Sequence, residues 1–100
     1  MEKDKEEKLQ DKLKMFAEFY LVDLVKDQYP FVEKIEVTNF TKNEHTNKFY
    51  PEFVVRVSDN MNYSVLLLTN VKQTIRESIE KFFSDSFTLL NANINFIKNT

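Results

Sequence analysis

The sequence predicts an α+β fold, a two-layer sandwich in which two helices pack on one face of a three-stranded sheet. Apolar residues recur at spacings of three and four in two segments, which is typical of amphipathic helices. They alternate with polar residues in three other segments, which is typical of half-buried strands. The order is α-β-β-α-β, and laying both helices on one side of the sheet buries all five apolar faces economically.

The first predicted helix spans residues 5–28. Its main apolar stripe consists of Leu9, Leu13, Phe16, Ala17, Tyr20 and Leu24. Additional apolar residues widen this stripe: Phe19, Leu21, Val22 and Val25. The helix is therefore expected either to be covered on two sides or to expose an apolar patch. Tyr29-Pro30 should end it, because proline lacks the amide donor and disfavours helix in the preceding residue.

Residues 31–40 and 49–58 are predicted strands, joined by the polar loop 41–48 into an antiparallel hairpin. In the first strand Ile35 and Val37 should face the core, opposite Lys34, Glu36 and Thr38. In the second strand the core-facing set is Phe53, Val55 and Val57. Pro51 has to lie near a strand start or on an edge, because it cannot donate a ladder hydrogen bond.

The second helix is predicted over residues 65–84, but its start is ambiguous. Either Ser64 caps it, or residues 63–68 form a short strand and Thr69 or Asn70 is the cap.

In residues 87–98 apolar and polar side chains alternate, which predicts a final strand. Together these patterns predict a core of Leu13, Phe16, Tyr20, Leu24, Ile35, Val37, Phe53, Val55, Val57, Val71, Ile75, Ile79, Phe82, Leu90, Ala92, Ile94 and Phe96.

Length and composition point to one domain over residues 1–100, with a frayed, charged N-terminus at 1–8. The net charge of −2 argues against a strong attraction to nucleic acid, so nucleic acid is not an expected partner. The chain has no cysteine, which excludes thiolate zinc sites and cysteine nucleophiles. It also has no glycine, which excludes Walker loops, dinucleotide fingerprints and GxxG clamps.

No residue is a convincing catalyst. His45 lies in a polar loop and is the only histidine, so it is expected to be a solvated loop residue. Glu77 and Glu80 have Arg76 and Lys81 beside them and are expected to form a solvated helix face. We therefore expect no enzyme activity, no cofactor, and neither a catalytic nor a metal site.

The expected location is the cytoplasm. No apolar run is long enough for a membrane span, and Met1 to Lys8 lead into no signal-peptide core. Any association with the cell envelope would then be peripheral and made through a partner. The abundance of Lys, Asn, Phe and Ile, which have AT-rich codons, suggests an AT-rich bacterium.

The outer face of the sheet is the candidate interaction face. Its proposed members are Val54, Arg56, Asn91, Asn93, Asn95 and Ile97. The alternating asparagines could belong to a solvated strand, to a docking face, or to an edge that pairs with a second copy. Phe40 and Tyr50 could join Arg56 there as a platform for nucleic-acid bases, although such residues are more often at the rim of a core.

From Val54 to Phe96 the chain resembles the alkaline shock protein family, the Gls24-like cell-envelope stress proteins. The resemblance rests on Val55-Arg56-Val57 for a strand, on the helix positions Val71, Ile75, Ile79 and Phe82, and on Phe87 with Leu90-Asn91-Ala92-Asn93-Ile94 for the last strand. It implies a non-catalytic scaffold or interaction module, self-associating or envelope-associated, whose partner is a protein or a second copy. It transfers no active-site residue.

The element order and the pair Ile75-Arg76 are also similar to ribosome-binding factor A. That resemblance implies an RNA-binding role in ribosome assembly, for which a basic surface would be expected. A third alternative is a small accessory subunit of a larger complex.

Overall fold

The computed structural model describes residues 2–42, 44–45, 49–59, 62–83 and 93–99. Its elements are α1 (Glu2–Met15), the π-helix η1 (Phe16–Leu21), α2 (Val22–Gln28), β1 (Val32–Lys42), β2 (Phe49–Ser58), α3 (Val65–Phe83) and β3 (Asn93–Asn99). Helical backbone angles continue through the junctions at Met15 and Val22, so α1, η1 and α2 form one continuous N-terminal helix. The predicted α+β class and α-β-β-α-β order are confirmed.

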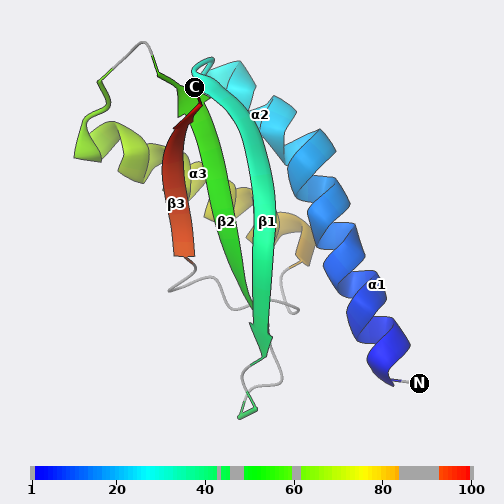
Figure 1. Ribbon diagram of the computed structural model, residues 1–100. Helices are drawn as coiled ribbons and strands as arrows, with labels where there is room; N and C mark the ends of the chain where they lie inside the picture. Colours follow the sequence, from blue (N-terminus) through cyan, green and yellow to red (C-terminus); the bar gives the residue numbers. More distant parts are fainter. Residues whose placement is uncertain (1, 43, 46–48, 60–61, 84–92, 100) are drawn as a thin grey trace.

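The sheet has the order β1-β2-β3. β1 and β2 form the predicted antiparallel hairpin, and β3 runs parallel to β2. The N-terminal helix and α3 lie on the same side of this sheet (Figure 1). In the same view α3 crosses behind the strands and β3 lies to the left of β2, which is the right-handed crossover expected between parallel strands.

Local sequence explains where α3 begins and fits the start of the described β2–β3 pairing. The backbone amide of Leu67 donates a hydrogen bond to Ser64 Oγ over 3.1 Å, so Ser64 is the N-cap of α3 and the alternative strand at 63–68 is wrong. Pro51 is the third residue of β2, and the described pairing of β2 with β3 begins one residue later, at Glu52. Tyr63 donates its hydroxyl proton to the backbone carbonyl of Ser58, which ties the turn after β2.

The core lies between the helices and the inner face of the sheet. Its buried members are Leu13, Ala17, Leu21, Val25, Val32, Ile35, Val37, Phe49, Phe53, Val55, Val57, Val71, Ile75, Ile79 and Ile94. All predicted core residues on β1 and β2 are among them, as are three on α3 and Ile94 on β3. Phe16 and Phe96 are partly buried against this cluster. Residues 87–92, including the predicted Leu90 and Ala92, lie outside the described residues.

The prediction was wrong for one face of the N-terminal helix and for the end of α3. Tyr20, Leu24 and Phe82 are exposed. The buried stripe is instead Leu13, Ala17, Leu21 and Val25.

The π-helix explains this register. Consecutive buried residues of the stripe are four positions apart, and in an α-helix four residues advance about 40° beyond a full turn. Three such steps would rotate the stripe well away from the sheet. The i→i+5 hydrogen bonds of a π-helix put more residues into each turn, which offsets the drift over Phe16–Leu21. Ala17 and Leu21 therefore both reach the core.

None of the helices in the described part of the chain has the length and apolarity needed to cross a membrane.

Candidate interaction surfaces

The structure brings the predicted outer-face residues together. Val54 pairs with Asn95, and Arg56 pairs with Ile97, across the β2–β3 ladder. Asn93 lies two residues before Asn95 on β3 and pairs with Glu52 of β2. Asn93, Asn95 and Ile97 are exposed, and Val54 and Arg56 are half-buried. Asn91 lies outside the described residues. The five described members thus share the sheet face that is turned away from the helices, and their role in docking stays a prediction.

Glu36 organises the charge on this face. Its Oε1 atom accepts a hydrogen bond from Arg56 Nε at 3.2 Å and lies 3.2 Å from Lys34 Nζ. The hydrogen bond from Lys34 and then the one from Arg56 hold the pKa of Glu36 below its ordinary value, although desolvation of the carboxylate opposes them. Two cations and one carboxylate are therefore arranged as a local network rather than as a basic patch.

Phe40 does not lie on this face. The ladder between β1 and β2 shifts register between Val37 and Asn39, and an extra residue reverses the side on which later residues point. Phe40 consequently packs against the core, with its ring 6.4 Å from that of Phe49. Tyr50 pairs with Thr41, one position away in the ladder, and so points to the opposite side. The alternative in which Phe40, Tyr50 and Arg56 form a base-stacking platform is therefore wrong, and Phe40 lies at the rim of the core, as the favoured interpretation had it.

The remaining candidates for chemistry are scattered. His45 lies in an exposed turn beside Glu44, at the tip of the β1–β2 hairpin. The described ranges contain no group of three or more His, Cys, Asp or Glu side chains arranged to hold a metal ion.

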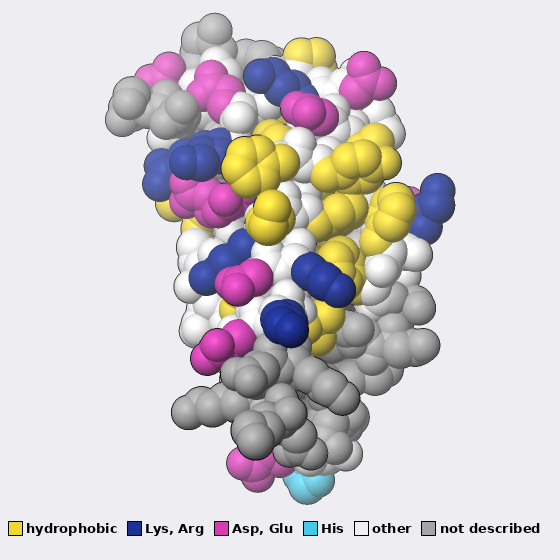
Figure 2. Space-filling view, turned by 90° about the vertical axis from the view of Figure 1, so that its right-hand side faces the viewer, with side chains coloured by type: hydrophobic (Ala, Val, Ile, Leu, Met, Phe, Trp, Pro, Cys, Tyr) yellow, Lys and Arg dark blue, Asp and Glu magenta, His cyan; other side chains and the backbone are white. Residues whose placement is uncertain are grey.

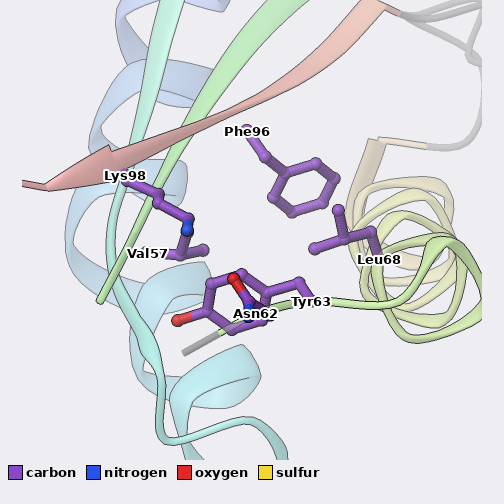
Figure 3. Close-up of a pocket in the computed structure, with 6 residues that line it drawn as sticks. All are labelled: Val57, Asn62, Tyr63, Leu68, Phe96 and Lys98. Carbon is purple, nitrogen blue, oxygen red and sulfur yellow. The ribbon is translucent and has the colours of Figure 1, made fainter. Parts of the chain in front are cut away.

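A pocket of about 280 Å³ opens between β3 and the start of α3. Figure 3 shows Phe96 and Lys98 from β3, Val57 from β2, Leu68 from α3, and Asn62 with Tyr63 from the preceding turn. Its described walls combine apolar and aromatic side chains with the Asn62 amide and the Lys98 amine. Among the described lining residues there is no carboxylate or imidazole that could act as a general base.

The most unusual surface is a hydrophobic patch on the N-terminal helix, called the helix patch below. It consists of Met15, Phe19, Tyr20 and Leu24, which are 63%, 68%, 50% and 39% exposed. These residues span the π-helix and the two turns beside it. Figure 2 looks at this side of the molecule and shows hydrophobic side chains gathered in a band across it. Contiguous apolar surface of this kind marks interaction sites in folded proteins.

An aromatic cluster supports one side of the helix patch. The ring of Phe16 lies 5.3 Å from Tyr20, 5.1 Å from Phe82 and 5.4 Å from Phe83. The Tyr20 and Phe82 rings are 5.7 Å apart, nearly edge to face. These contacts join the N-terminal helix to the end of α3 and hold Tyr20 in place at the surface.

The sequence contained part of this signal. The apolar residues of segment 5–28 outnumber those that one core stripe needs, and one of the two expected outcomes, an exposed patch, is what the structure shows. Periodicity alone could not tell which stripe would be outside, because the stripes 16-20-24 and 17-21-25 have the same spacing.

Comparisons of this chain with protein-family models, with curated proteins and with solved structures find no match.

Proposed function

We propose that this chain is a non-enzymatic protein-interaction module that docks through the helix patch. One observation carries the proposal: four large apolar side chains lie next to one another on a helix and are all well exposed. Leaving them in water forgoes a hydrophobic free energy of about 25 cal/mol per Å² of apolar area. A partner that covers the patch recovers it.

The positions of these residues strengthen the proposal. Phe19 and Met15 lie on the side of the helix opposite Ala17, where a monomeric helix normally carries polar residues. Neither Met15 nor Phe19 packs against the core, so burial within the described fold does not account for their apolar side chains.

The resemblance to the alkaline shock family is part of the same proposal. It is supported by the order β2–α3–β3, and of the residues quoted for the last strand Asn93 and Ile94 lie in β3, whereas Phe87 and residues 90–92 lie outside the described residues. RNA binding gains less support, because the cations Lys34 and Arg56 of the outer sheet face both contact Glu36.

The test is affinity purification from native cells with the wild type, with Phe19→Lys and with Leu66→Lys. Leu66 is 71% exposed at the start of α3, outside the helix patch, and is the matched control. We expect Phe19→Lys to lose a stoichiometric protein partner that both other forms retain, while its circular dichroism and melting temperature stay unchanged. Equal retention by all three would contradict docking through the helix patch.

A further inference from the structure

We infer that the pocket between β3 and the start of α3 binds a small amphiphilic carboxylate, a molecule with an apolar tail and one anionic head. The site is separate from the helix patch, and the inference does not depend on the proposed function. It rests on the lining, which offers apolar surface for the tail and two unengaged polar groups for the head.

The size and the apolar walls of the pocket suit a small tail. Its volume of about 280 Å³ lies just under the ~300–1,000 Å³ of most small-molecule pockets, so the ligand is smaller than a typical drug. The Phe96 ring and the Leu68 side chain lie on one side of it, and Val57 and Tyr63 add further apolar surface (Figure 3). Phe96 is only partly buried against the core, so a tail can cover the rest of its ring.

Two polar side chains, Lys98 and Asn62, lie on the other side of the pocket in Figure 3. Within the part of the chain that the structure describes, no hydrogen bond or ion pair engages the Lys98 amine or the Asn62 amide. The Tyr63 hydroxyl, by contrast, is already bonded to the Ser58 carbonyl. Lys98 and Asn62 are both exposed, so a ligand can reach two groups that donate hydrogen bonds.

The charges near the pocket select an anionic head. Lys98 is the charged residue of the described lining, and the Lys72 amine lies 5.9 Å from the centre of the Phe96 ring. These two ammonium groups attract an anion and repel a cation. A carboxylate matches the donors, because one oxygen can accept from Lys98 and the other from Asn62. A phosphate has more charge and more acceptors than these two side chains can satisfy.

Octanoate is a suitable probe, since it combines an unbranched apolar tail with a single carboxylate. The test is titration of the isotope-labelled chain with octanoate, followed by the amide signals in two-dimensional NMR spectra. Octanol and octylammonium, which have the same tail and a neutral or cationic head, are titrated separately. We expect the amides of Val57, Leu68 and Phe96 to shift, with a Kd for octanoate on the order of a millimolar. Octanol should bind more weakly and octylammonium most weakly.

Variants of Lys98 test the head. Lys98→Met keeps an apolar stem but removes the charge, so it should weaken octanoate binding roughly tenfold and leave octanol binding unchanged. Lys98→Arg should bind octanoate nearly as the wild type does. Lys26→Met makes the same change at an exposed lysine of α2 and is the matched control, which should have no effect.

A second set of variants tests the tail and separates this site from the helix patch. Leu68→Asn removes apolar wall and should weaken octanoate and octanol binding alike, with circular dichroism as the check on folding. Phe19→Lys should bind octanoate at the pocket as the wild type does. Lys98→Met should still retain a protein partner captured through the helix patch, so either proposal can fail without the other.

Three outcomes overturn the inference. If millimolar octanoate leaves the pocket amides unshifted, the pocket is not a site for this class of ligand. If octanoate and octanol bind equally and Lys98→Met changes neither, the head is not recognised. If the shifts are confined to the N-terminal helix and disappear in Phe19→Lys, the tail binds the helix patch instead.

Discussion

Leu21 is fully buried, whereas Leu24, three residues later on the same helix, is 39% exposed. The two leucines lie on either side of the boundary between the core and the helix patch. That boundary depends on the π-helix, which keeps Leu21 in line with Leu13 and Ala17.

Substitution of each leucine by alanine should therefore have unequal effects. Leu21→Ala removes a buried side chain and should lower the free energy of unfolding by about 2–5 kcal/mol. Leu24→Ala should lower it by less than about 1.5 kcal/mol, since much of that side chain remains in water. Both changes alter helix propensity equally, so the difference reports packing. Urea unfolding measures both losses, and equal losses would contradict the register.

The N-cap of α3 gives a second prediction. Ser64→Ala removes the oxygen that accepts a hydrogen bond from the Leu67 amide and should cost about 0.5–2 kcal/mol. Ser64→Asp keeps an acceptor and should remain near the wild type. Thr69→Ala, on the exposed face of the same helix, should change stability by less than about 0.5 kcal/mol. Thermal unfolding followed by circular dichroism distinguishes them; a Ser64→Ala chain as stable as the wild type would show that the cap is dispensable.

Acid should weaken the network around Glu36. Because its pKa is lowered in the folded chain, its contribution is present above the ordinary glutamate pKa and is lost as the pH falls through the folded value. Glu36→Gln should thus be less stable than the wild type at pH 7, by no more than about 1 kcal/mol for so exposed a pair. Below the folded pKa the two chains should converge. Urea unfolding at several pH values tests this, with Glu80→Gln as the exposed control; a gap that persists in acid would mean that packing, not charge, is responsible.

The outer sheet face can be separated from the helix patch by the double change Asn93→Lys with Asn95→Lys. Both side chains are exposed, so each substitution should alter stability by about 0.5 kcal/mol or less. Capture of a protein partner through the helix patch should be unchanged, because the helix patch lies on another side of the molecule. Loss of self-association or of a partner in this folded variant would assign the docking role to the sheet instead.

Local patterns were sufficient for most of the fold. Alternation predicted β2 with the bounds that the structure has, and periodicity predicted α3 to within one residue. These patterns succeed because the periodicity of a helix or strand by itself determines whether a side chain faces the core or the solvent. On the N-terminal helix two stripes of equal spacing compete, and the choice depends on how closely the helix approaches β1. Ala17 faces the core where a phenylalanine was expected, because η1 packs against that strand.

The two candidate interaction surfaces, the outer sheet face and the helix patch, could be predicted from the sequence only in part. The outer-face residues follow from alternation and β pairing, and their positions hold wherever the structure describes them. Phe40 lies at the rim of the core, which is the interpretation that was favoured over the base-stacking platform. The bulge between Val37 and Asn39 that turns its side chain to that side could not be predicted, because neither residue type marks a bulge. The helix patch could be anticipated as an excess of apolar residues, but its members depend on the π-helix.

The parallel pairing of β2 with β3 has a consequence for how the chain folds. Lys42 pairs with Phe49 only seven positions away, whereas Glu52 pairs with Asn93 forty-one positions later. Closing the longer loop costs more conformational entropy, and no ladder bond offsets that cost until α3 has carried the chain back. We expect the hairpin and α3 to assemble first and β3 to join last. Until it joins, one side of β2 presents unpaired backbone donors and acceptors, and a strand of another newly made chain can occupy them.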